Sequence, residues 1–185
     1  MQNIKRFINK SFKMFCFGFI PLMLLAGTSK ENFDTPRLDN GTCSFKVDGE
    51  LSFNLNGAAT FENKTEVDRL GYKTNKLLLH FTSCNDKEMQ ILEFIIASDK
   101  VDKLDVQIGK HKIKDLNHLI NNFNGVYGFA DLGSVSELPF FIDSGDITIT
   151  EFFSNNVDGK LEVQLVNAEG VFLKIKGSFN ADIKA

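Results

Sequence analysis

Apolar residues recur at every second position in eight short runs of the chain, with polar residues between them. The runs cover 43–47, 51–55, 77–81, 92–96, 104–108, 147–149, 161–165 and 171–175. A period of two is typical of strands with one buried face, and the Gly, Asn and Asp residues between the runs indicate turns. The gaps are too short for the helical crossovers that parallel strands need. The pattern predicts an all-β fold, an antiparallel β-barrel or β-sandwich of about 8–10 strands in one domain.

The facing of the apolar residues also predicts two hairpin loops. A three-residue loop pairs Val47 with Leu51 and keeps the apolar residues of both strands on one face. A five-residue loop over 166–170 does the same when it pairs Leu165 with Val171. We therefore expect these two registers.

Two segments depart from simple alternation. Residues 89–97 are apolar on both faces, which suits a central strand covered on both sides or an edge strand packed beneath a loop or helix. Residues 115–123 place apolar side chains at helical spacing behind Asp115, a plausible cap. One short helix is expected there, with an Asn-rich loop as the alternative.

The first 29 residues have the composition of an export signal. They contain four basic residues and no acidic one, and an apolar run extends from Met14 to Gly27. That run is shorter than the roughly 20 residues of a membrane-spanning helix. We predict a signal peptide at 1–29, a flexible lead-in at 30–42 and a single antiparallel β domain at 43–185. The expected location is the periplasm or the extracellular space; the alternative is a chain anchored to the membrane by an uncleaved signal.

Without the leader the chain is acidic and rich in phenylalanine. It keeps 17 basic and 24 acidic residues, a net charge of −7, and the whole chain has 19 Phe, 2 Tyr and no Trp. An acidic domain without a basic stripe argues against nucleic acid and anionic membrane surfaces. Membrane contact is expected only through the leader, if it is uncleaved.

Two cysteines follow the leader, Cys43 and Cys84. Export permits disulfides, and a bridge between them would stabilise the fold by roughly 2–4 kcal/mol. Cys84, however, is out of phase with Leu77 and Leu79 in its own strand. A Cys43–Cys84 disulfide and two free thiols both remain open.

The sequence contains no local motif for catalysis or metal binding. The three histidines, His80, His111 and His118, lie outside any zinc-binding spacing, and His80 occupies the outward phase of its strand. No nucleophile elbow, P-loop or dinucleotide fingerprint is present. Residues 143–146 (Asp-Ser-Gly-Asp) read as a tight turn rather than a calcium site. We therefore predict no catalytic residue, no cofactor and no metal.

Three sequence segments carry a resemblance to a family. They are Phe45-Lys46-Val47-Asp48-Gly49, the run Gly145-Asp146-Ile147-Thr148-Ile149-Thr150, and Gly177-Ser178-Phe179-Asn180. Over most of 43–182 the chain resembles a group of exported β-rich proteins of Bacteroidota that are usually lipoproteins and have no assigned activity. The resemblance implies a cell-envelope β domain. The chain differs from the group at Thr28, where the lipidated cysteine would stand, and at Leu51-Ser52 and 160–162.

Three functions fit these observations. The first is a non-catalytic exported module of the cell envelope that binds a protein or glycan or plays a structural role. The second is a lipocalin-like carrier of a small apolar ligand inside a barrel. The third is a hydrolase with a dispersed loop site near His111 and His118.

Overall fold

The computed structural model describes residues 38–67, 71, 73–85, 88–98, 108–113 and 125–184. All regular structure in this part of the chain is β-strand, which confirms the all-β prediction. No helix among these residues is long and apolar enough to cross a membrane. The strands are β1 (Thr42–Asp48), β2 (Phe53–Val67), β3 (Lys73–Asn85), β4 (Glu88–Ser98), β5 (Gly109–Lys112), β6 (Gly125–Asp131), β7 (Phe140–Phe152), β8 (Asn156–Val166) and β9 (Phe172–Ile183).

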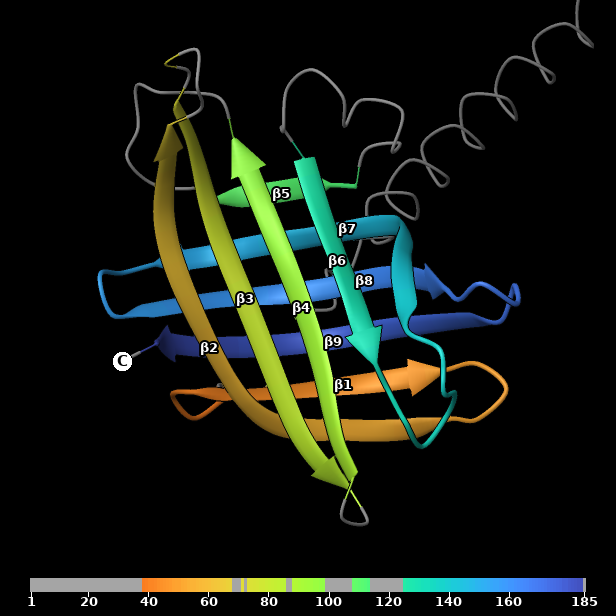
Figure 1. Ribbon diagram of the computed structural model, residues 1–185. Helices are drawn as coiled ribbons and strands as arrows, with labels where there is room; N and C mark the ends of the chain where they lie inside the picture. Colours follow the sequence, from red (N-terminus) through yellow and green to blue (C-terminus); the bar gives the residue numbers. More distant parts are fainter. Residues whose placement is uncertain are drawn as a thin grey trace, which may run out of the picture. The chain divides into compact units, whose positions relative to one another are not determined.

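Eight of these strands close into an antiparallel barrel. Hydrogen-bonded neighbours follow the order β1, β2, β3, β4, β6, β7, β8 and β9, and β9 pairs with β1 to complete the ring. In Figure 1, β3, β4 and β6 cross in front of β1 and β7–β9. Within the described residues, the extra strand β5 pairs with β7 alone. Of the two predicted architectures, the barrel is the one observed.

The long strand β2 bends and serves both sides of the barrel (Figure 1). Its first part pairs with β1 and its second part with β3, and the change of partner falls at Ala58. Gly57 stands at this point, where a Cβ atom would lie 2.0 Å from the carbonyl oxygen of Thr82. Glycine is therefore required for the close approach of the two backbones.

Phenylalanine side chains fill the middle of the barrel. Phe81 has an exposed fraction of 0%, and its ring centroid lies 5.0 Å from that of Phe45, 5.2 Å from that of Phe179 and 6.2 Å from that of Phe94. The edge-on and tilted arrangements are those that aromatic pairs prefer. The high phenylalanine content of the chain thus supplies its core.

Three of these rings lie against a glycine on the neighbouring strand. Phe45 pairs with Gly177, Phe94 with Gly128 and Phe179 with Gly159. A Cβ atom at Gly128 would lie 2.3 Å from the Phe94 ring, and one at Gly159 would lie 2.4 Å from the Phe179 ring. Since an eight-stranded barrel has little interior width, these glycines make the room that the rings occupy.

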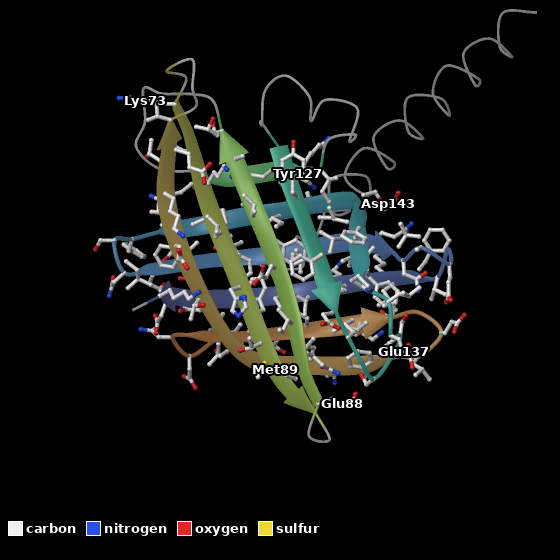
Figure 2. All side chains as sticks on the ribbon, in the orientation of Figure 1. Lys73, Glu88, Met89, Tyr127, Glu137 and Asp143 are labelled. Carbon is white, nitrogen blue, oxygen red and sulfur yellow. The ribbon has the colours of Figure 1, made fainter. Side chains whose placement is uncertain are left out.

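The connection from β6 to β7 covers one end of the barrel. Leu132 of this segment is fully buried. Its Ser134 hydroxyl accepts a hydrogen bond from Gln90 Nε2 (2.8 Å), and its Ser136 hydroxyl accepts one from Asn167 Nδ2 (3.3 Å). Figure 2 shows Glu137 of this connection near the end of the barrel marked by Glu88. Polar bonds at the rim therefore close this end over the apolar interior.

Both predicted hairpins have the correct facing but the wrong register. Val47 pairs with Phe53 rather than Leu51, and Leu165 pairs with Leu173 rather than Val171. In each hairpin the observed partner lies two residues further along the second strand than the predicted one. A two-residue slide leaves every side chain on the same face, so alternation cannot detect it.

The predicted tight turn at 143–146 is wrong. These residues lie inside β7, where the pairing with β8 shifts between Ile142 and Ser144. Gly145 has φ +115°, and a Cβ atom there would lie 2.2 Å from the carbonyl oxygen of Glu162. The Asp-Ser-Gly-Asp signal marks a β-bulge, which uses the same residue types as a turn.

Some of the remaining predicted elements fall on described residues and others do not. Strand β4 lies between β3 and β6, so residues 89–97 form a central strand rather than an edge strand, but the outward residues Ile91 and Ile95 are only half-buried. The expected helix at 115–123 and most of the expected strand at 104–108 lie outside the described residues. Strand β6 was not predicted, because Gly128 occupies an inward position and Tyr127 and Phe129 occupy outward ones.

The structure does not form the Cys43–Cys84 disulfide, since Cys43 is a free thiol whose Sγ donates to the Ala58 carbonyl oxygen (3.7 Å). Cys43 is on β1 and Cys84 is on β3, with β2 between them.

Cys43 should resist alkylation in the folded protein. Burial raises the pKa of its thiol to about 12, so at pH 8 its thiolate fraction is about a thousandfold below that of an unfolded cysteine. We expect iodoacetamide to leave the Cys43 peptide unmodified in the native protein and to label it in urea, as measured by peptide mass mapping. Equal labelling rates in both conditions would contradict the buried position.

Candidate functional site

One row of outward-facing residues crosses seven adjacent strands of the barrel. Each member is the direct cross-strand partner of the next. We call it the outer row; from β2 to β9 it consists of Thr60, His80, Glu93, Phe129, Phe141, Val166 and Phe172. The row is polar on β2–β4 and apolar on β6–β9, and the two parts have different chemistry.

The apolar part of the outer row is unusually open to solvent. Phe141 and Phe172 have exposed fractions of 55% and 56%, and Val166 lies between them on β8. The inward neighbours, Phe140 and Leu173, take the core positions. Because an outward strand face in water is normally polar, two exposed phenylalanines in register indicate a contact surface. We call Phe129, Phe141, Val166 and Phe172 the aromatic segment.

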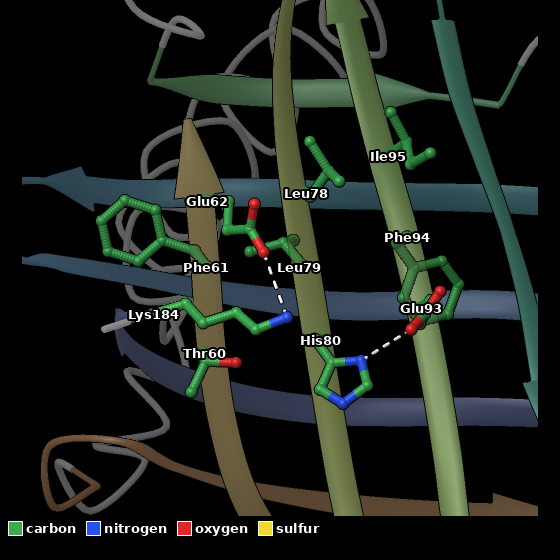
Figure 3. Close-up of a pocket in the computed structure, with 10 residues that line it drawn as sticks. All are labelled: Thr60, Phe61, Glu62, Leu78, Leu79, His80, Glu93, Phe94, Ile95 and Lys184. Carbon is green, nitrogen blue, oxygen red and sulfur yellow. Dashed lines mark hydrogen bonds and ion pairs between the residues drawn. The ribbon is translucent and has the colours of Figure 1, made fainter. Parts of the chain in front are cut away.

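The polar part of the outer row borders a small pocket (Figure 3). The pocket has a volume of about 80 Å³, and Leu78 and Ile95 are among the residues that line it. His80 Nδ1 lies 2.8 Å from Glu93 Oε1, and Lys184 Nζ lies 3.1 Å from Glu62 Oε1. The hydrogen bond from Lys64 and, to a smaller extent, the one from Lys184 hold the pKa of Glu62 below its usual value.

The His80–Glu93 pair can orient an imidazole for hydrogen bonding. With Nδ1 directed at the carboxylate, Nε2 is free to contact a ligand. Thr60 is the cross-strand neighbour of His80 on β2. The exposed fractions of the His80 and Glu93 side chains, 33% and 45%, indicate a solvated pair. This confirms the outward position predicted for His80.

A second polar cluster joins β8 and β9. Asn156 Nδ2 donates to Asn180 Oδ1 and to Asp182 Oδ1 (3.1 Å), and Asn180 Nδ2 donates to Asp158 Oδ1 (2.7 Å). Asn180 is fully buried, and its hydrogen bonds satisfy it. The cluster therefore fixes the strand pair.

The described residues hold no group of three His, Cys, Asp or Glu side chains that could bind a metal ion. His111 lies on β5 opposite Ile147, and His118 is outside the described residues. Asp146, considered above for calcium, instead pairs with Lys110 at 2.8 Å.

Sequence reasoning missed the aromatic segment, although one signal of it was present. Phe172 occupies the polar phase of the run 171–175, where an apolar side chain has no core to enter. Phe141 directly follows the buried Phe140. Two residues out of phase indicate exposed apolar area, but only the register shows that they are neighbours.

Comparison of the chain with family models, curated proteins and solved structures finds no match.

Proposed function

We propose that this chain is an exported, non-catalytic binding module of the cell envelope that contacts a macromolecular partner through the aromatic segment of the outer row. Export rests on the basic, acid-free leader and its apolar run. The resemblance to exported β-rich proteins of Bacteroidota is in keeping with that location. Anchoring by an uncleaved leader remains the alternative to release.

The observation that carries the binding role is the aromatic segment. Phe141 and Phe172, both more than half exposed, flank Val166 on three consecutive strands. Rigid sheet backbones hold these side chains, so little conformational entropy is lost when a partner covers them. Aromatic side chains also supply much of the binding energy at protein interfaces.

The size of the pocket bordered by His80 argues against a small-ligand site at that place. Its volume of about 80 Å³ is well below the roughly 300–1,000 Å³ of small-molecule sites. A hollow of this size can accept one side chain or one ring of a larger partner. The pocket lies on β2–β4, and β3 is opposite β8 in the ring, so this hollow is separate from the aromatic segment.

A lipocalin-like carrier is the second candidate, and the closed eight-stranded ring favours it. The described interior, however, is filled around Phe81 by rings at centroid distances of 5.0–6.2 Å. Native mass spectrometry of the purified protein distinguishes the candidates, because a carrier retains an apolar ligand.

Photo-crosslinking tests the binding surface. We expect benzoylphenylalanine at position 141 or 172 to give a discrete adduct in cells that make the protein. These residues project from the barrel and need no rearrangement to meet a partner. Adduct masses are read by electrophoresis and mass spectrometry.

The matched control is benzoylphenylalanine at Phe153, which has a similar exposed fraction of 53% but lies between β7 and β8, outside the outer row. Equal adducts at 153, or none at 141 and 172, would contradict the proposed surface. A glycan array probed with wild type and with Phe141→Ser/Phe172→Ser tells a glycan partner from a protein partner.

A further inference from the structure

The aromatic segment is bordered by loops that carry acidic residues. The β1–β2 loop is close to Phe172, since a Cβ atom at Gly49 would lie 2.8 Å from its carbonyl oxygen. The β6–β7 connection meets the β8–β9 loop through the Ser136–Asn167 hydrogen bond. The exposed acidic residues on these loops and at the adjoining strand ends are Glu50, Asp131, Glu137, Asp143 and Glu169. We call them the acidic rim; Figure 2 shows Glu137 and Asp143 on one side of the barrel.

Basic residues are missing from this part of the sequence. No Lys or Arg occurs from 115 to 159, and none occurs in the loops 49–52 and 167–171. Lys174 lies two residues beyond Phe172, but Glu162 engages it at 3.2 Å. The local charge around the aromatic segment is therefore negative, and it adds to the acidic balance of the chain after its leader.

We infer that the partner is a protein segment that is both cationic and amphipathic, and this inference rests on the proposed binding function. Large apolar side chains of the segment cover Phe141, Val166 and Phe172, and its Lys or Arg residues face the acidic rim. Apolar contact supplies affinity. The negative charge of the acidic rim speeds association with a cationic partner and disfavours binding of acidic proteins.

A second copy of the chain fits this surface poorly. A two-fold interface brings the same patch together from both sides, so Glu137 and Asp143 would face acidic residues of the other copy. Like charges placed together at an interface are unfavourable. A neutral glycan could stack on the phenylalanines but would leave the rim without a counter-charge.

Peptide binding to the full chain tests the inference. The probes are an amphipathic Lys/Leu peptide and a Glu/Leu peptide with the same leucine spacing, titrated calorimetrically at low and high salt. We expect the Lys/Leu peptide to bind, with an affinity that falls as the salt concentration rises. The Glu/Leu peptide should not bind. Phe141→Ser/Phe172→Ser should abolish binding.

Charge variants locate the effect. The affinity for the Lys/Leu peptide should fall about tenfold in the triple variant Glu137→Gln/Asp143→Asn/Glu169→Gln, because the variant removes three charges from the acidic rim. The control Asp39→Asn/Glu66→Gln/Glu151→Gln changes net charge equally at exposed acids outside the acidic rim, and should leave affinity within about twofold. Equal weakening by both triples would overturn the inference, because the attraction would then be bulk charge.

Two further outcomes separate this inference from the proposed function. If both peptides bind equally and both need the phenylalanines, the cationic partner is wrong while the binding surface stands. If neither peptide depends on the phenylalanines and crosslinking at 141 also fails, both proposals fall. If a peptide of residues 1–29 binds more tightly than the Lys/Leu peptide and the purified chain retains that segment, the occupant is the chain's own leader, and a separate partner is excluded.

Discussion

Phe81→Ala is expected to destabilise the protein by about 3–5 kcal/mol, the range found when a buried phenylalanine is truncated. Phe81 is fully buried and contacts the rings of Phe45, Phe94 and Phe179. Its removal leaves a cavity that the surrounding strands cannot close, because each strand is held on both sides by its neighbours in the ring. Domains of this size are typically stable by only about 5–15 kcal/mol. Urea unfolding followed by circular dichroism measures the loss.

Phe153→Ala is the control for this substitution. The Phe153 side chain is 53% exposed, so its truncation should change stability by less than about 0.5 kcal/mol. If Phe81→Ala does not fold, Phe81→Leu provides a milder test with a loss near 1 kcal/mol. Equal losses at positions 81 and 153 would show that the aromatic cluster does not form the core.

Gly145→Ala should destabilise the protein by about 3 kcal/mol through strain and overpacking. Gly145 has φ +115°, a region that side chains avoid, and the new Cβ atom would lie 2.2 Å from the carbonyl oxygen of Glu162 and 2.7 Å from the Cα atom of Val163. Both neighbours are backbone atoms of β8, so relief requires the strands to move apart. Thermal unfolding by calorimetry gives the change.

Gly170→Ala separates strain from collision. Gly170 also has a positive φ, +82°, but nothing lies within 4 Å of the position of its Cβ atom. We expect a loss of about 1 kcal/mol from backbone strain alone. A loss at 170 as large as that at 145 would mean that contact with β8 contributes nothing.

The strand faces were predictable because an antiparallel barrel has one wet and one dry side. Phe45, Val47 and Leu165 all reach the core that alternation assigned to them. The register of the cross-strand pairs was harder to predict from the sequence. A slide of two residues preserves every face, so Val47 was matched with Leu51 when its partner is Phe53.

Strand β6 shows a second limit of the pattern. Its inward residues include Gly128, which is small because the Phe94 ring occupies the space opposite. Its outward residues include Phe129, which belongs to the aromatic segment. A packing demand on one face and exposed apolar area on the other remove the alternation that marks a strand.

The candidate binding surface depends on long-range neighbours, which explains why motif searching could not find it. Phe129 and Phe172 are 43 residues apart in the sequence and meet through two intervening strands. Only the individual out-of-phase positions could be noted in advance. Their assembly into one row follows from registers that alternation does not determine.

The pairing of β9 with β1 has a consequence for folding. Every other ladder of the ring joins strands that follow one another along the chain, apart from the short insertion of β5. The β9–β1 ladder instead brings Thr42 against Asn180, so nearly the whole polypeptide must be organised before it can form. Loop-closure entropy rises slowly with length, and its cost falls on the pairing of β9 with β1 and on the short pairing of β9 with β2, where Thr60 meets Asp182. The hairpins can form one after another along the chain. The pairing of β9 with β1 then closes the sheet into a barrel.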